Sequence, residues 1–293
     1  MKGFIEHLIA ENKKLEQDLI DDYEALHAPV SHRELLAMQL RGDEESWIIN
    51  MADCGLLTSK TLDIASDLLE EADRILERQR SMGIRTVSFL DTMSYPASLN
   101  DLGVFRPLLL HGMGDWELLD APRRIAVIGS RYASDAGLVA ARNLGRMYGA
   151  GDAGHEPCVV ISGLACGCDT AAHEGCLDAG GDTVAVVATG LDRVYPAENA
   201  SLFQRILDEG GLVLSERQIG IMAVGNLRPR NRIIAALAEL IAVPECRKES
   251  GTMDAVEKAL RLGRDVRVAA HSVYDTWTSG NEWLLSSGMA SPV

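Results

Sequence analysis

The sequence predicts an α/β fold: a Rossmann-like, doubly wound and mainly parallel sheet, preceded by a small helical N-terminal domain. From residue 124 onward, short β-branched apolar runs alternate with segments of helical periodicity. These runs are apolar throughout, as strands covered on both faces are. Residues 1–83 instead carry apolar residues at helical spacing among many acids. We therefore expect an acidic helical region (1–83), a connector packing on the core (84–122) and a Rossmann-like core (123–293).

The first region is expected to consist of helices. We predict an amphipathic helix over 1–27, a second helical region from Ser31 and a third helix from about residue 59 to 82. Ser31 and Glu34 have the spacing of a capping box, and Gly83 is typical of a helix C-terminus. No convergent set of acid, base and nucleophile falls here, so these helices are expected to serve as scaffold or partner surface.

The connector, residues 84–122, differs from the helical region before it. Thr86–Leu90 predicts a short strand, and Leu108–Leu110 predicts an edge strand, because prolines and glycines surround both.

Six strands and five helices are expected in the core. The strands are placed at 124–129, 158–162, 183–188, 212–215, 239–244 and 265–269, and the helices near 135–149, 169–179, 199–209, 231–238 and 253–262. Right-handed crossovers between parallel strands bring their carboxyl ends, and the loops that follow them, to one edge of the sheet.

Composition restricts the location and partners of the protein. None of the apolar runs in the 293 residues approaches the ~20 residues of a membrane span, and the N-terminus lacks the apolar stretch of a signal peptide, so we expect a cytoplasmic protein with no membrane association. The net charge is −15, and residues 1–121 carry 11 basic against 23 acidic residues. This balance disfavours a nucleic-acid binder overall, although a local basic cleft can act within an acidic molecule because salt screens distant charges.

The six cysteines raise the question of a metal site. Cys166-Gly167-Cys168 with His173 nearby could hold zinc, but the spacing is not that of the usual fingers and no matching second pair exists. We expect buried, reduced thiols, no metal and no cofactor.

Four strand-to-helix loops carry the candidate chemistry: 129–131, 162–169 followed by His173, 228–232 and 249–252. Each alone is an ordinary tight turn at a helix start. Together they combine hydroxyls, glycines and arginines at one predicted edge of the sheet, which favours phosphate recognition.

Two of these loops are informative in detail. Gly129-Ser130-Arg131 is expected to present free backbone N–H groups, a helix dipole and a forked cation to an anion. In the second loop, Asp169 is expected to cap the following helix, and His173 lies one turn further on the same face. His173 could bind a phosphate or base, or orient the loop from within the core, which we favour.

At these loops the sequence resembles the DNA-processing protein A (DprA, also called Smf) family of bacterial single-stranded-DNA binders. The matching segments keep the family order and span about residues 84–290. They are Tyr95-Pro96 with Leu99; Ala126-Val127-Ile128-Gly129-Ser130-Arg131; Ser162-Gly163-Leu164-Ala165-Cys166-Gly167-Cys168-Asp169 with His173; Gly190-Leu191-Asp192, Tyr195-Pro196 and Asn199; Leu214-Ser215-Glu216; Arg230-Asn231-Arg232-Ile233-Ile234-Ala235; Ser250-Gly251-Thr252; and Gly280-Asn281, Leu284 and Gly288.

The resemblance implies a Rossmann-like core that binds single-stranded DNA, self-associates as a homodimer, protects incoming DNA and helps load the recombinase RecA during natural transformation. It brings no catalytic residue and no enzyme activity. It implies that Arg131 binds phosphate on the turn of Gly129 and Ser130. Around it, the resemblance implies a pocket backbone of Ser162, Gly163 and Gly167 and a basic wall of Arg230, Asn231 and Arg232, so Arg131, Arg230 and Arg232 are expected to face one groove. The full expected nucleic-acid site is Gly129, Ser130, Arg131, Ser162, Gly163, Gly167, Asp169, His173, Arg230, Asn231, Arg232, Ser250, Gly251 and Thr252.

The chain departs from the family pattern at three places. Leu227-Arg228 stands where the family has Phe-Pro, which removes an aromatic platform for base stacking. Ala269-Ala270-His271 replaces a Pro-Gly turn. The sequence ends at Val293, so we expect the short form without a C-terminal winged-helix domain.

Two further interpretations are open at this stage. The chain could be a nucleotide-binding sensor or a nucleoside-monophosphate hydrolase on a related scaffold, with Asp254 or Glu257 after Thr252 as the catalytic carboxylate, although solvated helix surface is the simpler role for both. The acidic helices of residues 1–82 could hold a protein partner or shield the cleft as a DNA mimic.

Overall fold

The computed structural model describes residues 30–59, 62–151, 156–222, 227–271 and 275–293. These residues form two compact units, with the division between Leu76 and Glu77. The helix expected over 1–27 lies outside the described residues.

The first unit is helical, as predicted. It contains α2 (His32–Arg41), α3 (Glu45–Asp53) and most of α4 (Ser66–Ser81). The capping box is confirmed, since the Glu34 N–H donates to Ser31 Oγ at 3.3 Å and the Ser31 N–H donates to the Glu34 carboxylate at 2.8 Å.

The third predicted helix has its expected end but not its expected start. The backbone turns left-handed at Gly83, with φ of +76°, just after α4. The start at residue 59 was wrong, because α4 begins only at Ser66. Thr58, Ser59, Asp63 and Ser66 lie around the expected start, and such side chains compete for backbone hydrogen bonds and disfavour a helix interior.

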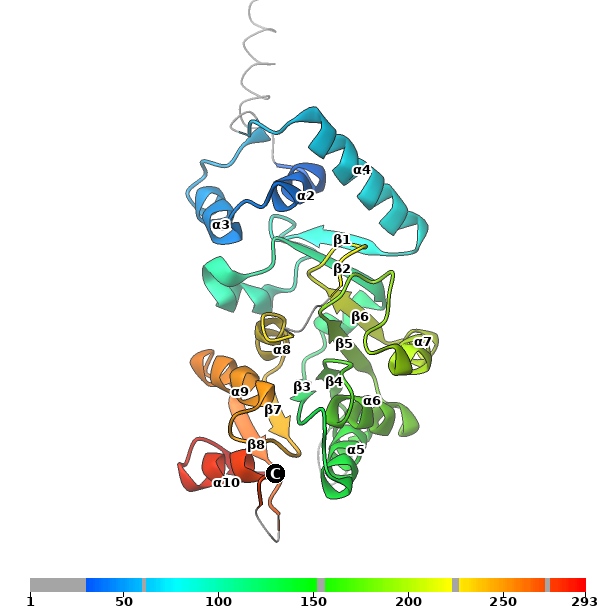
Figure 1. The fold of residues 1–293 in the computed structure, drawn as a ribbon, viewed down its shortest axis with the longest axis vertical. Helices are drawn as coiled ribbons and strands as arrows, with labels where there is room; N and C mark the ends of the chain where they lie inside the picture. The colour runs from blue at the N-terminus through cyan, green and yellow to red at the C-terminus, as the bar shows by residue number, and fades with distance from the viewer. Residues whose placement is uncertain (1–29, 60–61, 152–155, 223–226, 272–274) are drawn as a thin grey trace, which may run out of the picture. The chain divides into compact units, whose positions relative to one another are not determined.

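The second unit is built on one sheet, whose described strands follow the order β1-β2-β6-β5-β4-β3-β7-β8-β9 (Figure 1). The strands are β1 (Arg85–Ser88), β2 (Leu109–Gly114), β3 (Arg124–Val127), β4 (Val159–Ser162), β5 (Thr183–Val187), β6 (Leu212–Ser215), β7 (Leu240–Val243), β8 (Asp265–Val268) and β9 (Ser291–Pro292). All neighbours from β6 to β9 in this order pair in parallel. The antiparallel pairs are β1 with β2 and β2 with β6. The predicted α/β, Rossmann-like and mainly parallel sheet is confirmed.

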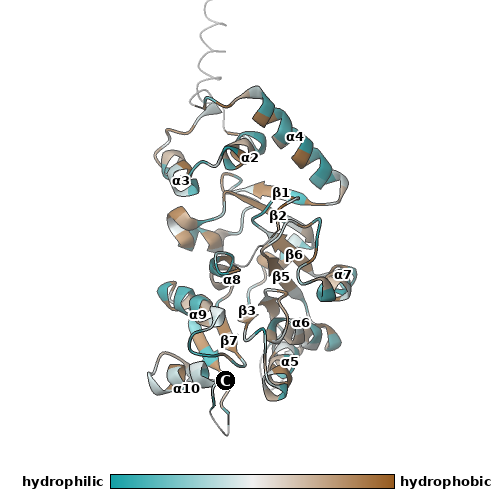
Figure 2. Ribbon diagram, viewed as in Figure 1, coloured by the Kyte–Doolittle hydropathy of each residue, from teal (hydrophilic) through white to brown (hydrophobic). Residues whose placement is uncertain are grey.

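Helices cover both faces of this sheet. They are α5 (Asp135–Ala150), α6 (Cys168–Asp178), α7 (Ala200–Asp208), α8 (Asn231–Leu237), α9 (Gly251–Arg261) and α10 (Ser279–Ser286), with short 3₁₀ helices at Ala97–Phe105, Trp116–Leu119 and Ala197–Asn199. Helices α5, α6 and α7 lie on one side of the sheet, and α8, α9 and α10 lie on the other (Figure 1). Their outer faces are polar and the strands between them are apolar (Figure 2), as a doubly wound core requires.

The connector contributes strands to the same sheet. Leu108–Leu110 was expected at an edge, but β2 has neighbours on both sides, with Val87 opposite Leu110 and Leu214 opposite Gly112. The edge position belongs to β1. A glycine is needed at 112, because a Cβ there would lie 2.5 Å from the ring of Trp116.

The strand order sets the position of a binding crevice. From β3 the chain winds through β4, β5 and β6 in one direction, and then returns to place β7 and β8 on the other side of β3. The loops after β3 and β7 therefore diverge, and ligands of open α/β sheets bind at such a switch point, outside the carboxyl ends of the strands. None of the described helices is long and apolar enough to cross a membrane.

Candidate nucleic-acid interface

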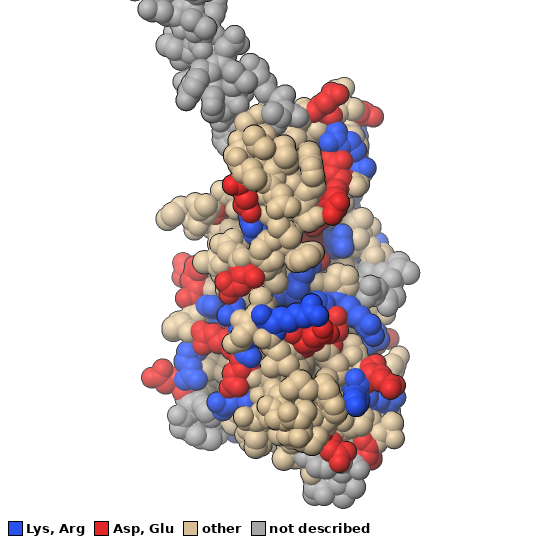
Figure 3. Space-filling model, turned by 90° about the vertical axis from the view of Figure 1, so that its left-hand side faces the viewer, with Lys and Arg blue, Asp and Glu red and all other residues tan. Residues whose placement is uncertain are grey.

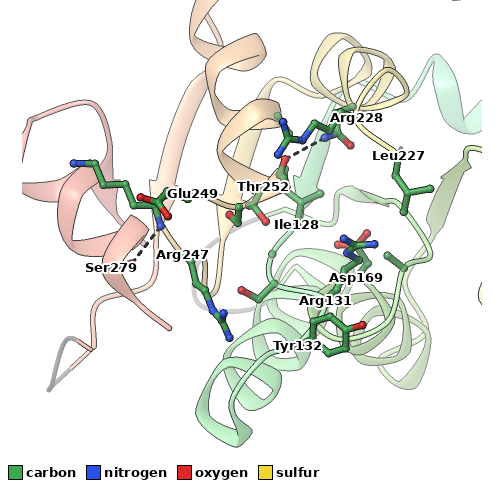
Figure 4. Close-up of a pocket in the computed structure, with 18 of the residues that line it drawn as sticks. Ile128, Arg131, Tyr132, Asp169, Leu227, Arg228, Arg247, Glu249, Thr252 and Ser279 are labelled. Atoms are coloured by element: carbon green, nitrogen blue, oxygen red, sulfur yellow. Dashed lines mark hydrogen bonds between the residues drawn. The ribbon is translucent and has the colours of Figure 1, made fainter. Parts of the chain in front are cut away.

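A groove of about 1140 Å³ lies at this switch point (Figure 4). Its walls come from the loop after β3 (128–132), the segment that leads into α8 (227–231), the loop after β7 (247–252) and the start of α10 with the residues before it. Ala165 and Asp169 of the loop after β4 complete the lining. All four loops chosen from the sequence thus contribute to one groove.

The turn after β3 is held tightly to its neighbours. The Ser130 N–H donates to the backbone carbonyl of Glu245 at 2.8 Å, and the Ser130 carbonyl accepts from the Cys168 N–H at 3.1 Å. Gly129 allows this approach, because a Cβ there would lie 2.6 Å from Cys168 Sγ. Gly167 has φ of +80°, and a Cβ on it would meet the Ser130 carbonyl at 2.4 Å. The two glycine turns therefore pack directly on each other.

The helix N-terminus after this turn is not free for a ligand, contrary to the expectation. Ser134 caps α5 by accepting from the Gly137 N–H at 3.1 Å. The Glu245 carboxylate accepts from the Ser134 N–H at 3.0 Å and from the Ser134 hydroxyl. This fully buried carboxylate occupies the place that an external anion would take at the helix dipole.

Asp169 and Arg230 form the buried floor of the groove. Burial raises the pKa of Asp169, while the Arg230 charge and the N–H groups of Ala165 and Gly129 favour its carboxylate form. Gly163 is required beneath them, because a Cβ there would lie 2.3 Å from Arg230 Nη1 and 2.6 Å from Asp169 Oδ2. Asp169 does not act as the predicted N-cap of α6, since that position is Gly167.

The Arg-Asn-Arg segment anchors α8 to the sheet. Arg230 is only 4% exposed and donates to the Gly163 carbonyl at 2.8 Å and to the Val186 carbonyl. The Asn231 amide donates to Gly251 O at 3.2 Å and to Asp254 Oδ2 at 3.0 Å, which ties α8 to α9.

Arg232 does not line the groove. Its guanidinium forms a bidentate pair with Glu216, at 3.0 and 2.5 Å, and donates to the Phe105 carbonyl at 2.7 Å. Burial alone would raise the pKa of Glu216, but the hydrogen bonds and charge of Arg232 outweigh it and lower that pKa. Of the three arginines expected to converge, Arg131 and Arg230 share the groove and Arg232 faces the end of β6.

Two further predicted residues, Ser162 and His173, lie beneath the groove. The Ser162 hydroxyl donates to the Val127 carbonyl at 2.6 Å, which links β4 to β3. His173 is fully buried, and its Nδ1 lies 2.7 Å from Thr183 Oγ1. Because the Thr183 hydroxyl donates to the Val160 carbonyl, His173 Nδ1 carries the proton of this hydrogen bond. Burial, with the Arg230 charge, lowers the pKa of His173 to about 3, so the ring is a neutral support for the loop.

The exposed cations of the groove include two that the sequence interpretation missed. Arg131 has no ion-pair partner among the described residues. Arg247 lies on the opposite wall (Figure 4). Its guanidinium stacks 3.7 Å from the Trp277 ring centroid, and Lys248 Nζ lies 5.1 Å from the Trp283 ring. A cation held over an aromatic ring is oriented without losing its charge to a carboxylate. These two residues adjoin the predicted 249–252 loop, and their spatial partners are about 30 residues away in sequence.

The local charge of the groove is positive, although the whole chain is acidic. The described lining contains five basic residues (Arg131, Arg228, Arg230, Arg247, Lys248) and three acidic ones (Asp169, Glu249, Asp275). Basic side chains also gather across the middle of the face in Figure 3, with acidic ones beside them.

The lining also holds two polar atoms that are buried without a hydrogen-bond partner among the described residues: Arg230 Nε and Ser250 Oγ. Both are donors, and buried donors without partners are rare in folded proteins. Gly251 and Thr252 lie next to Ser250 in the same wall. The excess of basic over acidic side chains in the lining matches an anionic ligand.

Asp254 and Glu257, the carboxylates considered for hydrolysis, are bound to other side chains. Asp254 accepts from Asn231 at 3.0 Å and from Lys258 at 2.6 Å, and Glu257 pairs with Arg261 at 2.5 Å. Neither residue belongs to the described lining of the groove.

Comparisons with known sequences point in one direction. The family model described as DNA recombination-mediator protein A matches residues 86–293. DNA processing protein DprA of Streptococcus pneumoniae is 37% identical over 195 residues, which cover 66% of this chain and 66% of that protein. Protein Smf of Synechocystis is 38% identical over 143 residues, which cover 48% of this chain and 34% of that protein. The chain thus matches just under two thirds of the pneumococcal relative and about a third of the cyanobacterial one.

Solved structures agree with the sequence comparisons. The X-ray structure of DprA from S. pneumoniae superposes with a TM-score of 0.66 at 31% identity, covering 92% of this chain and 93% of that one. DNA processing protein A from Helicobacter pylori, studied for its unique single-stranded DNA binding mode, gives a TM-score of 0.62 at 27% identity, covering 71% of this chain and 90% of that one.

Proposed function

The chain belongs to the DNA recombination-mediator protein A family, and from this premise we propose that it binds single-stranded DNA in the groove between the loops after β3 and β7. The observation that carries the proposal is the convergence of four loops on one groove, with exposed cations on facing walls that form no ion pair with a described residue. Arg131 stands on one wall and Arg247 with Lys248 on the other. Such an arrangement suits a backbone that carries one phosphate per nucleotide.

The fixed and free arginines take different parts in this proposal. Arg230 and Arg232 are committed to protein carbonyls and to Glu216, and they hold the walls in position. Arg131, Arg247 and Lys248 contact phosphates. Ser130, Ser250 and Thr252, on glycine-containing turns, bring hydroxyls and backbone close to the strand.

Arg131→Ala is the direct test, with Arg146→Ala as the matched control. Both variants lose one positive charge, but Arg146 is an exposed residue of α5 outside the described lining of the groove. Binding to labelled single- and double-stranded oligonucleotides is measured at two salt concentrations. The intact protein is expected to bind single strands with an affinity that falls steeply as salt rises.

The two variants are expected to separate clearly. Arg131→Ala should weaken binding about tenfold or more, because it removes a charge-assisted hydrogen bond, and should reduce the logarithmic salt slope by about 0.7. Arg146→Ala should stay within about twofold of the unchanged protein. Undetectable single-strand binding at low salt, or an equal loss in both variants, would overturn the proposal.

The wider role is proposed on the same premise. The protein acts without catalysis, as a homodimer in the cytoplasm, to protect incoming single strands and to help a RecA-type recombinase assemble on them during natural transformation. Sedimentation of the intact chain tests the dimer, and the rate of RecA assembly on strands precoated with the protein tests the loading. A screen of nucleoside monophosphates for base release tests the absence of catalysis, and robust turnover would favour the hydrolase interpretation.

A further inference from the structure

We propose that a second, smaller hollow beside the groove holds a nucleobase of the bound strand, with the ring of Tyr132 as its stacking surface. The proposal rests on the function proposed above and adds to it the place where a base is bound. Arg131 then binds the phosphate, and Tyr132, the next residue in the chain, binds the base.

The hollow has a volume of about 590 Å³ and lies between the N-terminal halves of α5 and α6. Its apolar wall consists of Ala133, Leu138, Val139 and Ala171. It shares Arg131 and Tyr132 with the groove, so the two spaces meet at these side chains. A strand whose phosphate pairs with Arg131 therefore has an apolar space directly beside that phosphate.

Tyr132 is placed to stack with a base. Its side chain is 78% exposed, and it is the aromatic residue that both described linings contain. No other aromatic side chain belongs to the described lining of the groove. Val139, one turn into α5, is 59% exposed and extends the apolar surface next to it. An aromatic face beside a phosphate-binding cation is the combination that proteins use to bind single strands without reading their sequence.

The charges of the hollow favour a base over a second phosphate. Arg142 lies in its lining, but it is neutralised by Glu174 and by Asp178. The Glu174 carboxylate belongs to the same lining and repels phosphate. Only Arg131, at the boundary with the groove, lacks an ion-pair partner among the described residues of this lining. The neutral base enters the hollow, and the phosphate stays at its rim.

The experiment compares Tyr132→Ala, Tyr132→Phe and the control Tyr195→Ala, using single strands of equal length with and without bases. Tyr195 is 42% exposed and belongs to neither described lining. We expect the unchanged protein to bind the strand with bases about tenfold more tightly than the abasic strand. Tyr132→Ala should lose most of this preference, while Tyr132→Phe and Tyr195→Ala should keep it.

Salt dependence distinguishes failure of this inference from failure of the proposed function. Tyr132→Ala should keep the salt slope of the unchanged protein, because no charge is removed. If Tyr132→Ala retains the full preference for bases, the base site is refuted while the phosphate-binding groove stands. If the unchanged protein binds neither strand, the proposed function itself fails. A strand carrying 2-aminopurine gives a second measurement, since stacking on Tyr132 should quench its fluorescence and Tyr132→Ala should abolish that quenching.

Discussion

Replacement of Glu245 by alanine should destabilise the protein and weaken DNA binding together. Glu245 is fully buried at the end of β7, and its carboxylate accepts from the N–H and the hydroxyl of Ser134. The carboxylate also packs on Gly137, since a Cβ at that glycine would lie 2.6 Å from Glu245 Oε2. Alanine removes all of these contacts but keeps the backbone carbonyl that accepts from the Ser130 N–H.

The size of the effect follows from these contacts. Loss of support for an N-cap costs about 1 kcal/mol, and loss of hydrogen bonds to a charged acceptor costs about 1.5–3 kcal/mol. We therefore expect Glu245→Ala to lower the free energy of unfolding by about 2–4 kcal/mol. Glu245→Gln should cost less, about 1 kcal/mol, because its oxygen can still accept from the Ser134 N–H and its amide can donate to the Ser134 hydroxyl.

Urea denaturation and DNA titration measure the two consequences. Glu249→Ala is the matched control, because Glu249 is an exposed residue on the same loop, and it should change the unfolding free energy by less than about 0.5 kcal/mol. Under conditions where every variant is folded, Glu245→Ala should still bind single strands less tightly, since the turn that carries Arg131 loses one of its attachments. Equal stability of the Glu245→Ala and Glu249→Ala variants would refute this account of the cap.

Three other predictions concern the buried part of the site. The pKa of His173 is about 3 in the folded protein and near 6.5 in the unfolded chain, so its contribution to stability is complete above about pH 6.5 and is lost as the pH falls toward 3. Denaturation at pH 7 and at pH 5 should therefore show that the free energy of unfolding is about 2 kcal/mol lower at pH 5, and His173→Gln should lack this decrease. Gly163→Ala should cost more than about 2 kcal/mol in the unfolding free energy, because its Cβ would displace Arg230, and an unchanged melting temperature would contradict this. Glu216→Gln should cost about 3 kcal/mol by leaving Arg232 without its carboxylate, and the double variant with Arg232→Met should recover part of that loss in the same assay.

The core could be predicted from sequence because its signal is local. A strand buried on both faces must be apolar along its length, so β3 to β8 were placed within about two residues of their observed ends. The loops were found for the same reason, since glycine turns interrupt apolar runs and leave polar residues between a strand and a helix. The order of parallel strands then brought these loops to one edge without further information.

The errors came from contacts between distant segments. Periodicity near Leu108–Leu110 indicated a strand but not its partners, and β2 pairs with β6, about 100 residues later. Likewise, Arg232 looked like a free cation because Glu216, which binds it, follows a different strand. Arg247 was overlooked because Trp277, which orients it, lies 30 residues further along the chain.

The division between anchored and free arginines changes how binding data on this groove must be interpreted. Loss of DNA binding in a variant of Arg230 or Arg232 does not identify a phosphate contact, because either change also unties α8 from the sheet or leaves Glu216 without its partner. Such a variant should lose stability and binding in parallel. A phosphate contact should instead lower the affinity and the salt slope while the unfolding free energy stays constant. Arg131 and Arg247 can satisfy that criterion, since neither has an ion pair to a described residue, and these two positions decide whether the strand passes between the loops after β3 and β7.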